Sequence, residues 1–271
     1  MSNKVKKSNI TRANELYRVR SGKVFEWYTE KRAEVAKSGL DYIEFEERGD
    51  IRRFELKVRF QTSNAKMQPT EKIAFLIFSI PAVMTCPGAT GMCIHNCYAR
   101  RDERFTTTRA SRLSNWLLSM RKDFPELLAD AIREAVYNAD GSMKKAFRGK
   151  KIIVRVHESG DFYSLDYMRK WFKVARLFPD LTFYAFTKSF DILSQCITET
   201  PDNFTFRASV WDDTPKTDLR FIATHELPYY TAVTSTAGIP SVNTCVCSVG
   251  CGGCGCKCCH KSITAIATEI H

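Results

Sequence analysis

The sequence lacks several features that would assign it to a well-known class of protein. No stretch reaches the about eighteen apolar residues that a membrane-spanning helix needs, and no apolar signal segment follows the polar, basic stretch Met1 to Lys7. It contains no phosphate-binding glycine loop, no dinucleotide-binding fingerprint and no serine nucleophile elbow. We therefore expect a cytoplasmic protein without a membrane partner, and these absences exclude the enzyme classes that such motifs mark.

Acidic residues are scarce relative to basic ones. The 271 residues include 41 Lys or Arg but only 30 Asp or Glu, which gives a net charge of +11. A positive charge of this size favours an anionic partner, and nucleic acid bound through a basic surface is the commonest example. The basic residues are spread along the chain, however, and solvated lysine and arginine faces explain the same balance.

Residues 1–71 have a different pattern from the rest of the chain, and we interpret them as a basic N-terminal α+β extension. A charged helical stretch, Val24 to Lys37, ends at Gly39. Two alternating runs follow, Tyr42 to Glu46 and Ile51 to Phe60, with the turn residues Arg48-Gly49-Asp50 between them. The pattern predicts a helix and a β-hairpin packed on the main domain.

Residues 72–271 alternate apolar runs with amphipathic helical patterns, which is typical of a parallel sheet with helical crossovers. The predicted strands are Ile73–Pro81, Ile152–His157, Leu181–Thr187, Phe204–Val210, Tyr229–Val233 and Ile263–Thr268. Helices are predicted over Asn115–Asn138 and Leu165–Phe178. We interpret this α/β pattern as a partial parallel β/α barrel of about six strands with a C-terminal Cys-rich segment, although an open doubly wound sheet fits it too.

Eleven cysteines are the most informative feature of the composition. In a compartment that keeps thiols reduced, clustered cysteines favour metal binding over disulfides. Three of them, at spacings of seven and four, lie in a loop that is predicted to bind metal: Cys86, Cys93 and Cys97. Seven more crowd the segment 245–259, and we predict six as ligands: Cys245, Cys247, Cys251, Cys254, Cys256 and Cys259. Cys196 is expected to be a small core residue.

Two kinds of metal centre fit these cysteines. Zinc takes four tetrahedral ligands, usually as two cysteine pairs, and Cys251 with Cys254 supplies one such pair. A [4Fe-4S] cluster also takes four thiolates, often from closely spaced cysteines. The crowding favours one or two [4Fe-4S] clusters, and a zinc-stapled nucleic-acid-binding protein is the alternative.

Polar residues lie at or near the ends of several predicted strands. Glu158, Ser159 and Asp161 follow the second strand, Lys188 follows the third, and Arg207 lies along the fourth. Because functional groups collect at the carboxyl ends of parallel strands, we expect these residues to bind a cofactor at one edge of the sheet. The structural alternatives are that Ser164 or Asp161 caps the helix that begins near Leu165, and that Lys188 directs its ammonium to the solvent.

Five motifs together resemble the phage-encoded gene product 88 family. They are Leu76–Pro81, Cys86-Pro87-Gly88-Ala89, Cys93–Ala99, Ser159–Phe162 and Thr187–Ser189, and the resemblance covers about residues 64–270. It implies a bacteriophage protein that acts in the cytoplasm of the host cell.

The position of the three-cysteine loop after the first strand is similar to radical S-adenosylmethionine enzymes, where three cysteines hold a [4Fe-4S] cluster with one iron left open. This resemblance implies that Glu158, Ser159 and Asp161 contact S-adenosylmethionine, that Lys188 or Arg207 binds its carboxylate, and that an electron donor is a partner. The cysteines are spaced more widely here, and Tyr98 follows the last cysteine instead of preceding it. The alternative is an electron-transfer or structural iron–sulfur protein without that cofactor, so catalysis is left open.

Overall fold

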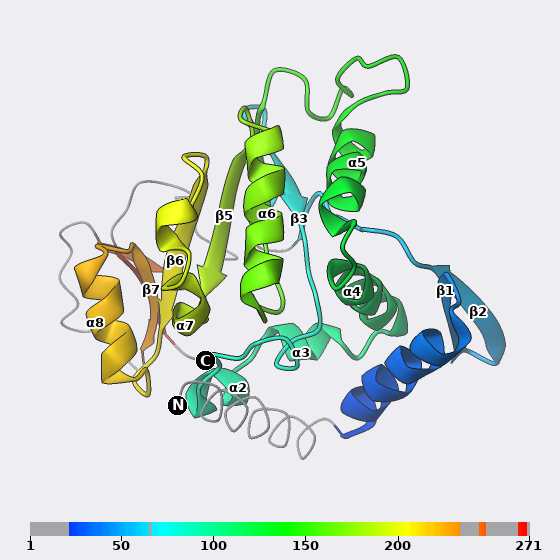
Figure 1. Cartoon of the computed structure of the whole chain (residues 1–271), viewed down its shortest axis with the longest axis horizontal. Coiled ribbons are helices and arrows are strands. Elements are labelled where there is room, and N and C mark those ends of the chain that lie inside the picture. The colour runs from blue at the N-terminus through cyan, green and yellow to red at the C-terminus, as the bar shows by residue number, and fades with distance from the viewer. Residues whose placement is uncertain (1–21, 65–66, 234–243, 248–264, 270–271) are drawn as a thin grey trace.

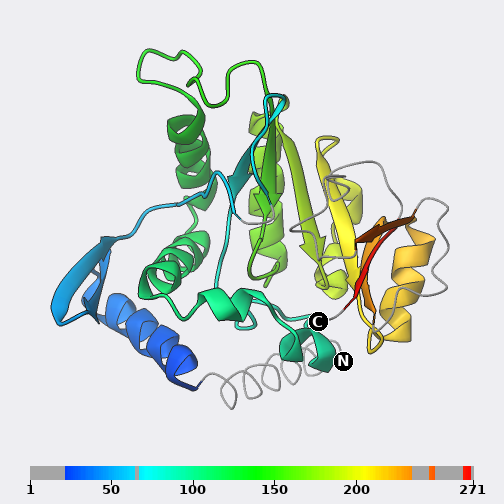
Figure 2. The same ribbon diagram turned by 180° about the vertical axis from the view of Figure 1, so that it is seen from behind.

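A computed structural model of the chain describes residues 22–64, 67–233, 244–247 and 265–269, with only the backbone described from residue 232 onward (Figure 1). A parallel sheet forms the centre, and helices α5 (Phe124–Val136), α6 (Leu165–Leu177) and α8 (Lys216–Thr224) lie on the same face of it (Figures 1 and 2). Among the described residues, every helix is too short or too polar to cross a lipid bilayer.

The main sheet has seven strands in the order β3-β4-β5-β6-β7-β9-β8, and every neighbouring pair is parallel. The strands are β3 Ile73–Ile77, β4 Lys151–Val156, β5 Thr182–Thr187, β6 Phe204–Val210, β7 Tyr229–Val233, β8 Thr244–Cys247 and β9 Ala265–Glu269. The predicted parallel α/β architecture is therefore confirmed. The described strands form an open sheet with β3 and β8 at its edges, so closure into a barrel is not observed and the partial barrel stays a prediction.

The helices of the described residues connect these strands. Their bounds are α2 Gly91–His95, α3 Ala99–Asp102, α4 Thr106–Ser119, α5 Phe124–Val136, α6 Leu165–Leu177, α7 Phe190–Leu193 and α8 Lys216–Thr224, and residues 22–38 are also helical. The prediction of a single helix over Asn115–Asn138 is wrong, because α4 ends at Ser119 and a separate helix, α5, begins at Phe124. Pro125 lies in the first turn of α5, where its missing N–H costs nothing, whereas inside a longer helix it would remove a backbone hydrogen bond.

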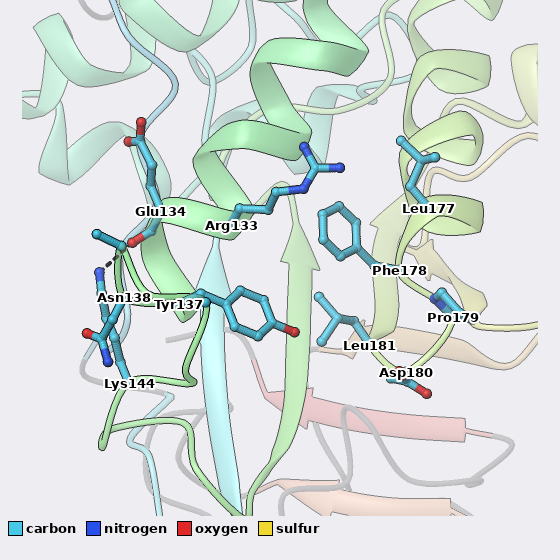
Figure 3. A pocket seen from close by; sticks show the side chains of 12 residues that line it. Arg133, Glu134, Tyr137, Asn138, Lys144, Leu177, Phe178, Pro179, Asp180 and Leu181 are labelled. Carbon is cyan, nitrogen blue, oxygen red and sulfur yellow. Dashed lines mark hydrogen bonds between the residues drawn. The ribbon is translucent and has the colours of Figure 1, made fainter.

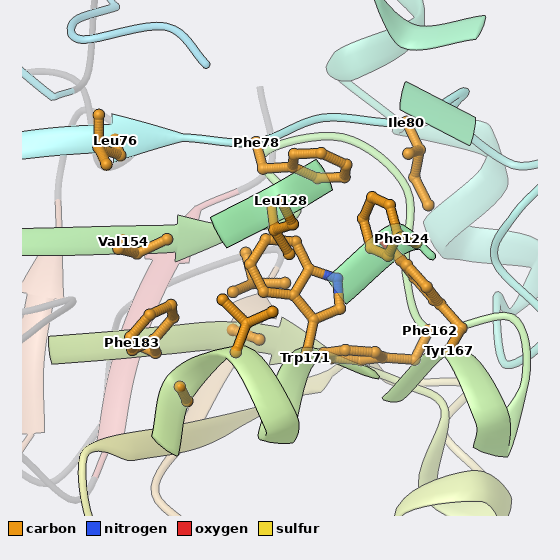
Figure 4. Packing of buried hydrophobic residues seen from close by; sticks show 14 of the residues in the cluster. Leu76, Phe78, Ile80, Phe124, Leu128, Val154, Phe162, Tyr167, Trp171 and Phe183 are labelled. Atoms are coloured by element: carbon orange, nitrogen blue, oxygen red, sulfur yellow. The ribbon is translucent and has the colours of Figure 1, made fainter. Parts of the chain in front are cut away.

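An aromatic core between the sheet and the helices fixes the positions of the strand ends (Figure 4). Leu76, Val154 and Phe183 point from neighbouring strands to the same face, as the two-residue period of a strand requires. Trp171 of α6 is fully buried among them, and its ring centroid lies 5.1 Å from that of Phe78. Rings of this size dominate the apolar area that a core buries, so α6 is held firmly on the sheet.

The predicted hairpin is confirmed. Strands β1 (Tyr42–Glu47) and β2 (Asp50–Glu55) pair antiparallel. Arg48 and Gly49 form the connection and both have positive φ, 55° and 86°, which is typical of the two-residue turn that matches the strand twist.

The second strand of this hairpin ends earlier than the pattern predicts. The alternating run to Phe60 leaves the ladder after β2, and its backbone then bonds to side chains of α4. The N–H of Lys57 donates to Ser114 Oγ (3.0 Å), and the N–H of Arg59 donates to Asn115 Oδ1 (2.8 Å). Side chains thus replace the strand partner, which the alternating pattern could not indicate.

Candidate functional site

The three-cysteine loop, which contains α2 and is followed by α3, lies at the carboxyl end of the sheet (Figures 1 and 2). Cys86 precedes α2, Cys93 lies within it, and Cys97 lies between α2 and α3. Thr90 begins α2 by accepting a hydrogen bond from the N–H of Cys93 (3.3 Å). All three thiols are free and half-buried, so the loop presents reduced sulfur to one end of the sheet.

The three thiols lie close enough to interact electrostatically. Burial raises the pKa of Cys86, and the charges of Asp161, Cys97 and Cys93 raise it further. Burial is also the main cause that raises the pKa of Cys97 to about 12, and backbone hydrogen bonds from Arg100 and Ala99 oppose it. The thiols are therefore neutral at pH 7 and would lose their protons on binding a metal, because the thiolate is the ligand.

Asp161 joins the ends of β4 and β5. Its buried carboxylate accepts hydrogen bonds from the N–H of Phe162 (2.7 Å), from Thr187 Oγ1 (2.8 Å) and from the N–H of Lys188 (2.8 Å). Of the two residues expected as alternatives to cap the following helix, Ser164 caps α6, and Asp161 does not. Asp161 therefore fixes the turn beside the cysteine loop through both of its oxygens.

Lys188 is buried beside the cysteines. Its ammonium donates to Ser209 Oγ, lies 5.6 Å from the centre of the Trp211 ring and also bonds to Cys93. Burial lowers the pKa of Lys188, and the charges of Cys93 and Asp161 oppose that effect. Only 7% of this residue is exposed, so its ammonium faces the cysteine loop and not the solvent, and its binding of a cofactor stays a prediction.

Close backbone contact holds the cysteine loop on the end of β5. A Cβ atom added at Gly88 would lie 2.0 Å from the carbonyl oxygen of Lys188, which is far inside van der Waals contact. Both partners in this contact are backbone, so no side chain can move aside. Only glycine fits at this position of the loop.

Replacing Gly88 with alanine should therefore destabilise the protein by about 1–3 kcal/mol, the typical cost of overpacking. Gly91→Ala is the matched control, because its Cβ would meet nothing nearer than Asp213 Oδ2 at 3.6 Å. Urea unfolding of both variants measures the difference. Equal stabilities of the two variants would contradict the close contact.

A buried ion network below the loop was not predicted from the sequence. Arg112 of α4 pairs with Glu103 (3.2 Å) and Glu158 (3.6 Å) and donates to the carbonyl oxygen of Ala99 (2.8 Å). Glu103 also accepts a hydrogen bond from the N–H of Ala82 (2.8 Å). The network therefore joins both ends of the cysteine loop, and it engages Glu158, which we expected to contact a cofactor.

Ser159 and Arg207 have different environments. Ser159 is buried, and its Oγ has no hydrogen-bond partner in the part of the chain that the structure describes. A buried hydroxyl without a partner costs stability, so this atom is available to a ligand. Arg207 is also buried, on β6 opposite Phe186 of β5, and Lys188 comes two residues after Phe186.

His157, at the end of β4, is a core residue. Its Nε2 atom lies 2.8 Å from the Tyr167 hydroxyl, and its ring packs edge-on against Phe162 with the centroids 4.5 Å apart. Burial lowers the pKa of His157 to about 3. The imidazole is therefore neutral in the folded protein at every pH above that value.

The stability of the protein should consequently fall as the solution is acidified. The unfolded chain, with the ordinary histidine pKa of about 6.5, binds a proton that folded His157 does not, so the contribution of His157 is present above pH 6.5 and lost below it. From pH 7 to pH 5 it should remove about 2 kcal/mol from the free energy of unfolding. Urea unfolding of His157→Asn should show a weaker pH dependence, with the exposed His225→Asn as control. Identical slopes for the wild type and His157→Asn would contradict this assignment.

The remaining predicted ligands lie in the C-terminal part. Cys245 and Cys247 lie in β8, where only the backbone is described, and Cys251, Cys254, Cys256 and Cys259 lie outside the described residues. Within the residues that are described, no group of three His, Cys, Asp or Glu side chains is arranged to hold a metal ion. Cys196 is 1% exposed and contacts Met168, as expected for a core cysteine.

A pocket of about 810 Å³ lies at the opposite, amino end of the sheet (Figure 3). Tyr137 and Phe178, which follow α5 and α6, contribute aromatic rings, and the Arg133 guanidinium lies 5.6 Å from the centre of the Phe178 ring. No residue of the cysteine loop lines this pocket, so it is separate from the site at the carboxyl end.

Comparison with known proteins gives a family match. The family profile described as "Gene product 88" matches residues 55–236. The "Gene 88 protein" of Mycobacterium phage L5 is 34% identical over 108 residues, which cover 38% of this chain and 43% of that protein. The protein of the same name from Mycobacterium phage D29 is 34% identical over 108 residues, 38% of this chain and 42% of that protein. The match thus spans less than half of each relative, and no solved structure matches the chain.

These matches support the expected bacteriophage origin and the resemblance to the gene product 88 family. Neither relative's name states a reaction or a ligand. The comparisons give no support to the resemblance to radical S-adenosylmethionine enzymes, which stays a prediction.

Proposed function

The chain belongs to the gene product 88 family, and on that premise we propose that it is a phage iron–sulfur protein of the host cytoplasm whose first [4Fe-4S] cluster is held by Cys86, Cys93 and Cys97. The gathering of three free, half-buried thiols at the carboxyl end of a parallel sheet carries this proposal. Ligands at that end of an α/β sheet are positioned by the strands behind them.

The chemistry of the donor atoms fits such a cluster. Thiolates are soft ligands that select iron–sulfur clusters or zinc. Backbone N–H groups of Ala99 and Arg100 point at the Cys97 sulfur, and hydrogen bonds to the sulfurs tune clusters of this kind. A single ion needs its ligands gathered around one point, whereas the thiolates of a cluster bind different irons and lie further apart.

The C-terminal cysteines have two roles open to them in this proposal. They hold a second cluster, or one of them completes the first. Six positions are proposed as ligands: Cys245, Cys247, Cys251, Cys254, Cys256 and Cys259. If a C-terminal cysteine completes the first cluster, no iron is open to a cofactor, and the protein transfers electrons or is stabilised by its cluster.

In the finer form of the proposal, one iron stays open and the protein binds S-adenosylmethionine. That cofactor, when bound, supplies radical chemistry, while the chain supplies orientation and exclusion of water. Ser159 has a buried hydroxyl without a partner among the described residues, and Lys188 has a buried ammonium suited to a carboxylate. Arg207 is a second candidate for the carboxylate, whereas Glu158 and Asp161 would act mainly by shaping the site, since protein groups engage both.

Iron and sulfide analysis of protein purified without oxygen tests the main proposal. We expect iron and acid-labile sulfide in equal amounts, with about four of each per cluster. A colourless protein that contains zinc would overturn it and favour the zinc-stapled nucleic-acid-binding alternative. In that case, binding of DNA or RNA that weakens with salt would identify the anionic partner.

Electron paramagnetic resonance tests the finer form. Adding S-adenosylmethionine to the reduced protein should change the spectrum of the cluster if one iron is open. Ser159→Ala and Lys188→Met should weaken that response without lowering the iron content. An unchanged spectrum in the wild type would support the electron-transfer or structural alternative instead.

A further inference from the structure

The segment directly after the cysteine loop forms an exposed surface of positive charge and aromatic rings. We define the arginine patch as Tyr98, Arg101, Arg104 and Phe105. Tyr98 is 40% exposed and Phe105 is 51% exposed, and both arginines are exposed as well. We propose that this patch docks a small, acidic, one-electron carrier protein, an inference that rests on the proposed function.

Local charges make the arginine patch positive, because Arg101 and Arg104 are both exposed, whereas the neighbouring Asp102 is half-buried and offsets only one of them. The described residues include no ion pair for Arg101 or Arg104, and the Arg104 guanidinium lies 4.7 Å from the centre of the Phe105 ring. Glu103, between the two arginines in sequence, is fully buried and paired with Arg112, so it does not offset them at the surface. An acidic surface is complementary to this arrangement, and complementary charge speeds association.

The position of the arginine patch also favours an electron carrier. Tyr98 directly follows Cys97, and Ala99 donates a backbone hydrogen bond to that sulfur, so a partner on the patch would lie against the loop that holds the cluster. The carrier gives one electron to the oxidised cluster and is itself oxidised by one electron, and no bond or proton is transferred. Exposed aromatic and arginine side chains are enriched at protein interfaces.

Nucleic acid fits the arginine patch less well. A single strand requires a groove that follows the backbone over several nucleotides. The patch is confined to the eight residues from Tyr98 to Phe105, and another basic group, which includes Lys145 and Lys151, lies where the chain enters the amino end of β4. That distant group provides a matched control with the same number of charges.

The test measures how fast three full-length, cluster-loaded proteins are reduced: the wild type, Arg101→Glu/Arg104→Glu and Lys145→Glu/Lys151→Glu. The reductants are an acidic plant-type ferredoxin and photoreduced deazariboflavin, a neutral small molecule. With ferredoxin at low salt, the arginine-patch variant should react at least about tenfold more slowly than the wild type, and the distant variant should match the wild type. Added salt should slow the wild type towards the patch variant. All three should react equally with deazariboflavin.

Each outcome has a separate meaning. A wild-type protein without a cluster to reduce would overturn the proposed function itself. A cluster that deazariboflavin reduces, combined with equal ferredoxin rates in all three proteins, would overturn only the docking proposal. If ferredoxin reduced both variants equally slowly, the effect would come from overall charge, and the docking proposal would be overturned. If the patch variant kept its ferredoxin rate but lost binding of a single-stranded DNA oligonucleotide, the arginine patch would be a nucleic-acid site.

Discussion

Replacing Glu103 with alanine should destabilise the protein by about 3–5 kcal/mol, because the change leaves Arg112 buried without its nearest counter-charge. Glu103 is 0% exposed, and its Oε1 atom lies within 3.2 Å of the Arg112 guanidinium. The same oxygen accepts hydrogen bonds from the Tyr28 hydroxyl (3.2 Å) and the N–H of Ala82 (2.8 Å). The residue therefore connects the N-terminal helix, the start of the cysteine loop and α4 at one buried point.

A surface ion pair provides the matched control for this prediction. Lys173 and Glu126 lie 2.6 Å apart, but each side chain is 58% exposed, so Glu126→Ala should cost under about 1 kcal/mol. Urea unfolding of the two alanine variants gives both values. The double variant Glu103→Leu/Arg112→Leu should cost less than the sum of its single variants, since it leaves no uncompensated charge. A cost for Glu103→Ala as small as that for Glu126→Ala would show that the network does not support the loop.

The positions of most strands along the chain could be predicted, because each of these strands has an apolar pattern of its own. Apolar runs such as Ile152 to His157 alternate with amphipathic helices, and period and length alone distinguish the two. The end of α4 before α5 was missed, although Pro125 inside the apparent helix Asn115–Asn138 is a signal for it. Strand β8 could not be predicted, because its residues Thr244–Cys247 resemble the cysteine-rich segment that contains them.

The candidate site was predictable only where its residues follow strands. Asp161 and Lys188 follow neighbouring parallel strands, and parallel strands place their carboxyl ends at one edge of the sheet. Glu103 and Arg112 lie in the charged stretch Arg100 to Arg112, which reads like a solvated surface. A weak signal was present, since Arg112 falls four residues before Trp116 and so on the apolar face of α4. Its partners, however, depend on contacts that no local pattern specifies.

Replacing any one of Cys86, Cys93 and Cys97 with alanine should remove the iron of the first cluster, about four ions per chain, because only two of the ligands that the loop supplies then remain. The C-terminal cysteines would keep the iron of a second cluster, if one is present. We expect the visible absorption and the electron paramagnetic resonance signal of the first cluster to disappear in all three variants. Iron and sulfide analysis of anaerobically purified proteins gives the number of ions lost.

Cys196→Ala distinguishes loss of a ligand from loss of any cysteine. Cys196 is 1% exposed, and its sulfur lies 3.2 Å from the Met168 sulfur, so its replacement should lower stability but leave the iron content unchanged. The loop cysteines are half-buried, and their replacement should reduce iron much more than it reduces stability. If all four variants bound as much iron and sulfide as the wild type, the cluster would lie elsewhere. If Cys196→Ala alone lost iron, the ligand assignment would be wrong, since the required thiolate would then come from the core behind the sheet and not from its carboxyl end.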